Sequence, residues 1–178
     1  MRRFGALFLS LVLVCGLFAM PARAENEGAD DEPVIGMANP WTETTEEGML
    51  ETIGLSFAIP ENAENVTFRV LESEGMGEMT FTLDGMEFTA RIQAADDFTD
   101  ISGMYYEWAV INQEDLEIMG RPAWEARATE DGETIDLCMW FDVVPGVMYS
   151  LSTRAADLDG FDIMAVAEMV FAPMQEDA

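Results

Sequence analysis

The sequence contains neither histidine nor lysine. All eight basic residues are arginine, against 35 aspartates and glutamates. Histidine and lysine supply most general bases, imidazole metal ligands and Schiff-base nucleophiles. Their absence excludes Ser-His-Asp and Cys-His catalysis, HExxH metalloprotease chemistry and lysine-based covalent catalysis. Paired carboxylates could still catalyse hydrolysis, but among so many of them a suitably spaced pair carries almost no information.

Cysteine is also scarce, with only Cys15 and Cys138. Cys15 lies within residues 1–24, which have the features of a secretory signal peptide: two leading arginines, an apolar run, and small residues at Ala22 and Ala24 before the expected cleavage point. The alternative is an uncleaved membrane anchor. Cleavage leaves Cys138 as the only cysteine, so an intrachain disulfide is impossible and the fold must depend on its core.

Positively charged residues are scarce as well. The formal net charge is −27, and removal of three signal-peptide arginines makes it more negative. Such a charge repels nucleic-acid phosphates and anionic membranes and attracts cations and basic peptides. We therefore expect a secreted protein that binds no nucleic acid and, after signal cleavage, no membrane.

The remaining chain divides by composition. Residues 25–38 are acidic and poor in large apolar side chains, which predicts a disordered linker. Residues 39–173 are long enough for a single domain. Residues 174–178 are expected to form a disordered tail.

Helical spacing of apolar residues occurs at both ends of this domain. Thr44, three residues before Glu47, predicts a helix start, and Gly54 predicts its end. The second helix is predicted beyond Arg154, capped by Asp157 or Asp159 and ending before Pro173.

Between the two helices the apolar residues recur with a period of two. About seven strands are expected over residues 66–153, including one over 104–112. The predicted fold class is α+β: an antiparallel meander sheet with both helices packed on one face.

Turn signals predict which strand residues face one another. Two-residue turns at Asp84-Gly85 and Asp131-Gly132 place Phe81 opposite Phe88 and Arg127 opposite Asp136. A three-residue loop over 144–146 places Asp136 opposite Arg154 as well. The sequence thus predicts a row of ion pairs formed by Arg127, Asp136 and Arg154 on a polar sheet face.

This row is the first candidate site. Its ordinary interpretation is a structural set of cross-strand ion pairs, and its functional interpretation is an anion site formed by Arg127 and Arg154. Trp140 and Cys138 share the same predicted face. Trp140 would serve there as a stacking platform for a sugar or peptide, unless a helix or loop covers it. The Cys138 thiol is expected to be neutral because no basic residue besides arginine is available to lower its pKa.

A second candidate site lies in one loop with three carboxylates. Asp96, Asp97 and Asp100 predict at most weak Ca²⁺ binding of the extracellular type. We expect no other cofactor.

The C-terminal third, from Cys138 through Gly146 to Leu151 and the closing helix, resembles the last strands and helix of an uncharacterised bacterial family. The family is an extracytoplasmic domain of unknown function that is often attached to anti-sigma-like membrane proteins. The opening Asn39-Pro40-Trp41 is similar to that of its short secreted members, so the resemblance covers about residues 39–172. It implies a bacterial extracytoplasmic location and no established activity.

Taken together, these features predict a non-catalytic binding or interaction module for a protein, peptide or glycan. Two other functions remain open. One is a small carboxylate-dependent hydrolase, and the other is an acidic protein that binds calcium with low affinity.

Overall fold

The computed structural model describes residues 39–112 and 116–173. The predicted signal peptide, linker and tail (1–24, 25–38 and 174–178) lie outside these residues. Within the described part of the chain, no helix is long and apolar enough to cross a membrane.

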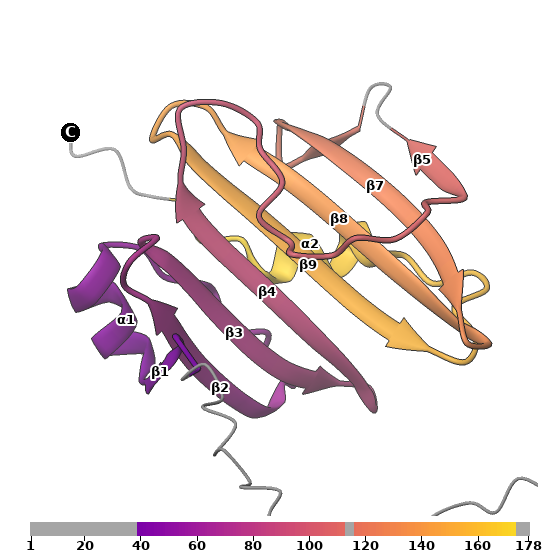
Figure 1. Ribbon diagram of the computed structural model, residues 1–178, viewed down its shortest axis with the longest axis horizontal. Coiled ribbons are helices and arrows are strands. Elements are labelled where there is room, and N and C mark those ends of the chain that lie inside the picture. The colour runs from indigo at the N-terminus through magenta and orange to yellow at the C-terminus, as the bar shows by residue number, and fades with distance from the viewer. Residues whose placement is uncertain (1–38, 113–115, 174–178) are drawn as a thin grey trace, which may run out of the picture. The chain divides into compact units, whose positions relative to one another are not determined.

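The described residues form a mainly antiparallel-sheet structure with two helices (Figure 1). The helices are α1 (Glu46–Ile53) and α2 (Ile163–Val170). The strands are β1 (Thr42–Thr44), β2 (Glu64–Leu71), β3 (Met76–Leu83), β4 (Met86–Ala94), β5 (Val110–Asn112), β6 (Glu117–Ile118), β7 (Arg121–Glu130), β8 (Glu133–Asp142) and β9 (Val147–Ala155).

The sheet is not the simple meander that the sequence predicted. Its order is β1-β2-β3-β4-β9-β8-β7-β5, with β6 paired to β7 beside this path. After β4 the chain crosses one face of the sheet to the far edge, and then returns through β7 and β8 so that β9 pairs with β4 (Figure 1). The strand predicted over 104–112 shrinks to the short edge strand β5.

Two of the three predicted hairpin registers are confirmed. Phe81 lies opposite Phe88, and Arg127 lies opposite Asp136. The first residue of each turn, Asp84 or Asp131, has a positive φ of 51° or 52°, and the following glycine is also left-handed. This is the conformation that a two-residue primed turn requires.

The third predicted register is wrong by one residue. The loop between β8 and β9 has four residues rather than three, so Thr153 lies opposite Asp136 and Arg154 lies opposite Ile135. Gly146 adopts a left-handed φ of 68°, and its N–H donates to the Asp142 carbonyl at 3.0 Å, which closes the longer loop. Arg154 therefore points to the opposite sheet face from Asp136, and the predicted three-residue row does not form.

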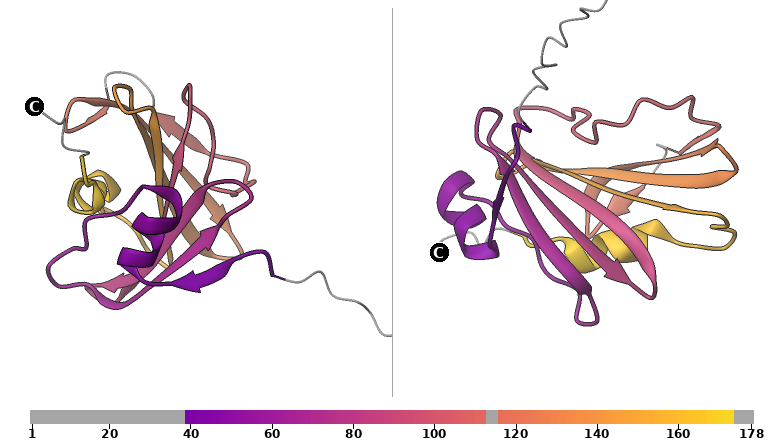
Figure 2. Two further views of the ribbon diagram at one scale, coloured as in Figure 1. Left: turned by 90° about the vertical axis from the view of Figure 1, so that its left-hand side faces the viewer. Right: turned by 60° about the horizontal axis from the view of Figure 1, so that its bottom comes forward.

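The same shift moves the large side chains of β9 to the face of Trp140. Tyr149 stacks on Trp140 with ring centroids 4.9 Å apart, and Phe171 packs edge-on against both rings. Trp140 has 0% exposure, so the predicted stacking platform is not at the surface. Met49 from α1 and Val166 from α2 belong to the same hydrophobic cluster, and the sheet curves around α2 (Figure 2).

The other face of the sheet is covered by residues 95–109, the segment that crosses from β4 to β5. Ile101 from this crossing segment packs with Leu137, Met139, Phe141 and Met148 in a second hydrophobic cluster. Strand β8 is consequently buried on both faces, which explains why its side chains are apolar on both.

The helices begin later than predicted. The N-cap of α1 is Thr45, whose hydroxyl accepts from Gly48 N–H, and Gly54 ends the helix in the left-handed conformation as expected. The N-cap of α2 is Asp162, because its carboxylate accepts from the N–H groups of Met164 and Ala165.

Candidate functional site

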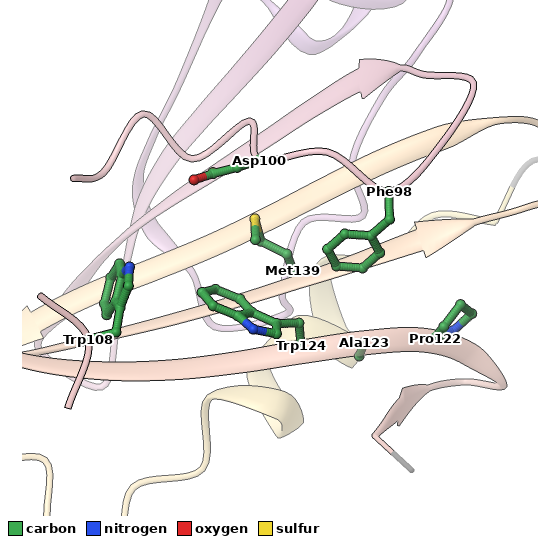
Figure 3. Close-up of a pocket in the computed structure, with 7 residues that line it drawn as sticks. All are labelled: Phe98, Asp100, Trp108, Pro122, Ala123, Trp124 and Met139. Carbon is green, nitrogen blue, oxygen red and sulfur yellow. The ribbon is translucent and has the colours of Figure 1, made fainter. Parts of the chain in front are cut away.

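An aromatic groove lies on the sheet face that the crossing segment covers. Its volume is about 560 Å³, and its walls come from both the sheet and the crossing segment (Figure 3). The lining residues are Phe98, Asp100, Trp108, Pro122, Ala123, Trp124 and Met139.

The floor of the groove is held by the sheet. Trp124 on β7 and Met139 on β8 are direct cross-strand partners, so their side chains stand side by side on one face. Trp108 packs edge to face against Trp124, with ring centroids 6.2 Å apart and ring planes at 87°. Tyr106 makes a similar edge-to-face contact with Trp108, with ring centroids 5.6 Å apart. The two tryptophans therefore form a perpendicular corner.

The crossing segment is fastened to the sheet by Arg91, which also belongs to a partly buried ion-pair network. Arg91 on β4 donates from Nη1 to the Ser102 carbonyl at 2.6 Å, and from Nε to Glu78 at 3.0 Å. Glu78 is buried and also accepts from Arg69. Gly103 has a positive φ of 66°, and an added Cβ would lie only 2.4 Å from Arg91 Nη1. A glycine is therefore required where the segment passes the guanidinium.

Asp100 is the single charged residue among the seven that line the groove. Its Oδ1 accepts from the Ser102 N–H at 2.8 Å and from the Ser102 hydroxyl at 2.7 Å, which orients the carboxylate. Phe98, with 37% exposure, lies at the surface end of the groove (Figure 3). The groove therefore offers apolar and aromatic surface with one negative group.

Of the predicted ion-pair row, the structure brings Arg127 and Asp136 together but not Arg154. Arg127 holds Asp136 through two hydrogen bonds of 2.6 Å, and its Nη2 also donates to the Leu158 carbonyl at 3.2 Å. This pair lies beneath the segment that leads into α2, and Asp136 has 0% exposure. The Nε and Nη2 groups of Arg127 are used internally, and Arg154 lies on the other face of the sheet, so the two arginines do not form the predicted anion site.

Arg154 is on the other face and has other partners. Its guanidinium lies 5.8 Å from the Tyr106 ring, donates to the Tyr106 hydroxyl, and is within 4 Å of Glu130 and Glu133. It is exposed, as expected for surface ion pairs.

The three predicted calcium ligands do not form a metal centre. Among residues 39–112 and 116–173, no group of three or more ligating side chains lies close enough to hold a metal ion. Asp97 caps the Phe98 N–H instead, and Asp100 is engaged with Ser102. Weak Ca²⁺ binding by Asp96, Asp97 and Asp100 stays a prediction.

Cys138 is fully buried beneath α2 and is not available as a nucleophile. Burial raises the pKa of its thiol well above the ordinary value, and the nearby negative charges of Glu125 and Asp162 raise it further. The neutral thiol expected from the composition agrees with this direction.

The effect of burial and of nearby negative charge on a pKa can be tested at Glu125, which lies opposite Cys138 in the sheet. Burial raises its pKa, and the charge of Asp136 adds to the shift. When the pKa of a carboxyl is higher in the folded state than in the unfolded state, the folded protein loses stability as the pH rises from the unfolded-state pKa to the folded-state pKa. The ionised Glu125 therefore destabilises the fold at neutral pH, and Glu125→Gln should raise the melting temperature there.

The gain from Glu125→Gln should fade below about pH 4, where the carboxyl is protonated in both states. Glu72→Gln removes the same charge at an exposed turn and serves as the control for net charge. A thermal melt of Glu125→Gln at pH 7 that rises no more than the Glu72→Gln melt would contradict this assignment.

Sequence reasoning missed the groove because its residues are far apart along the chain. Phe98 and Trp108 lie in the crossing segment, part of which is predicted to be a strand, whereas Trp124 lies on β7. One sequence feature could have indicated the groove: aromatic residues are concentrated over 105–108, in a segment where polar and apolar residues do not alternate as in a regular strand.

Comparisons with family models, with curated proteins and with solved structures find no match to this chain. The resemblance to the extracytoplasmic domain family therefore stays a prediction.

Proposed function

We propose that this chain is an exported bacterial binding module without catalytic activity, and that its ligand occupies the aromatic groove. The observation that carries the proposal is the perpendicular corner of Trp108 and Trp124 above Met139, open to Phe98 at the surface. Concave, mainly apolar sites with a few oriented polar groups are the usual form of ligand pockets.

The composition of the groove favours binding over hydrolysis. A carboxylate-dependent glycosidase needs two carboxyl groups on opposite sides of the bond that it cleaves. Asp100 is the only carboxylate among the lining residues. The same side chains suit an apolar or aromatic group of a protein, peptide or glycan, because rings gain from stacking as well as from burial.

Binding in the groove can be tested with Nile red, a neutral apolar dye that fluoresces on leaving water. We expect saturable binding to the full chain. Trp108→Ala should weaken it by at least about twofold, because a lost aromatic contact costs about 0.5–1.5 kcal/mol. Phe98→Ala should act in the same direction with little effect on folding, since Phe98 is partly exposed.

The matched control is Tyr105→Ala, an aromatic residue of the same segment that is 93% exposed and does not line the groove. It should leave the dissociation constant for the dye unchanged. Equal affinities for wild type, Trp108→Ala and Phe98→Ala would show that the dye binds elsewhere and would contradict the proposed site.

A further inference from the structure

We infer that the groove binds a small organic cation, specifically a quaternary ammonium group on a ligand without a carboxylate. This inference rests on the proposed function and names the ligand class of that same site. It is carried by three aromatic rings and one carboxylate that line a single groove (Figure 3).

The rings provide the walls that such a cation needs. The planes of Trp108 and Trp124 meet at 87°, and Phe98 lies beyond Trp124 at the surface end (Figure 3). A cation near the corner contacts electron-rich ring surface on more than one side. The gain from each such contact grows as the cation is desolvated.

The charges around the groove select a cation. Asp100 contributes negative charge, no arginine lines the groove, and the whole chain carries a formal −27. Elsewhere in the described residues arginines already lie over Trp41, Phe171 and Tyr106, whereas none lies over Phe98, Trp108 or Trp124. Among the described residues, no arginine of the chain therefore competes with an outside cation for these three rings. A carboxylate on the ligand would be repelled by Asp100.

The lack of polar partners favours a quaternary ammonium over a primary one. A primary ammonium has three N–H donors, and burying them without acceptors is costly. Of the seven lining residues, only Asp100 has an acidic acceptor; its Oδ1 accepts twice from Ser102, so its Oδ2 could serve at most one or two of the three N–H donors of a primary ammonium. A trimethylammonium group has no N–H to satisfy, and its methyl groups fit the apolar walls.

The experiment compares four small probes by isothermal titration calorimetry on the full chain, at constant ionic strength. Choline is the expected ligand. Its neutral isostere 3,3-dimethylbutan-1-ol tests the charge, ethanolamine tests the methyl groups, and glycine betaine tests the effect of a carboxylate. We expect choline to bind at least about tenfold more tightly than the neutral isostere, as two or more cation–ring contacts would give. Choline should also bind more tightly than ethanolamine, which has N–H donors to satisfy, and than glycine betaine, whose carboxylate Asp100 repels.

Two variants locate the effect. Asp100→Asn keeps an oxygen that accepts from Ser102 but removes the charge, and should weaken choline binding by at least threefold. Asp97→Asn makes the same change three residues away, at an exposed side chain that does not line the groove, and should leave choline binding unchanged. Trp108→Ala should weaken choline binding more than it weakens binding of the neutral isostere.

The outcomes separate this inference from the proposed function. Equal affinity for choline and 3,3-dimethylbutan-1-ol, or Nile red binding without choline binding, would overturn the cation inference and leave the groove as an apolar site. Equal losses in Asp97→Asn and Asp100→Asn would show a general charge effect and also overturn it. If neither Nile red nor choline binds, both the cation inference and the proposed function fail.

Discussion

Replacing Arg127 with leucine is expected to lower the free energy of unfolding by about 3–5 kcal/mol, because it leaves a buried carboxylate without its partner. Asp136 is fully buried and accepts both of its short hydrogen bonds from Arg127. The same substitution also removes the hydrogen bond to the Leu158 carbonyl, which ties β7 to the segment before α2. Urea denaturation of the two proteins measures the difference.

The control is Arg154→Leu, which removes an arginine from exposed pairs with Glu130 and Glu133. Its expected cost is below about 1 kcal/mol, since exposed ion pairs contribute little. The double variant Arg127→Leu/Asp136→Leu should recover part of the loss, because it removes the buried charge. If the losses measured for Arg127→Leu and Asp136→Leu separately add up to the loss of the double variant, Arg127 and Asp136 do not act as a pair.

The second large effect is expected at Trp140. Trp140→Ala should cost about 3–5 kcal/mol, the usual range for removal of a large buried aromatic side chain. It opens a cavity between Tyr149 and Phe171, both of which pack directly on the indole. Thermal or urea unfolding followed by far-ultraviolet circular dichroism measures the loss.

Trp140→Phe separates ring packing from the polar atom of the indole. In the described part of the chain, Trp140 Nε1 is buried without a hydrogen-bond partner. An unsatisfied buried donor costs about 1–3 kcal/mol, and phenylalanine removes it while keeping a ring against Tyr149. We therefore expect Trp140→Phe to cost less than half as much as Trp140→Ala. Equal losses would mean that the indole N–H has a partner in solution.

The sequence was a good guide wherever a turn had a distinctive residue pair. Asp84-Gly85 and Asp131-Gly132 both predicted the correct register, because only a few residue pairs tolerate two successive left-handed conformations. The loop before β9 has proline and glycine but no such pair. The sequence therefore predicts a loop one residue shorter than the one observed.

That error was not visible in the side-chain pattern. Strand β8 is apolar on both faces, so a one-residue slip of β9 still placed apolar residues opposite one another. Strand β8 is apolar on both faces because residues 95–109 cover one of them. This covering depends on contacts between residues far apart in sequence, such as Ile101 with Met139. The groove depends on the same distant contacts and was missed for the same reason.

The pairing of β4 with β9 also determines how the sheet assembles during folding. Other neighbouring strands are mostly joined by short turns, whereas Thr153 bonds to the Glu87 carbonyl across 66 positions. Closing so long a loop has a high entropic cost, so we expect β2–β4 and β7–β9 to form first as separate hairpin units and to join late. Residues 95–109 reach their place only then, because Arg91 on β4 anchors them above β7 and β8. Recovery of ligand binding during refolding would thus report the final step of folding, later than the recovery of strand content.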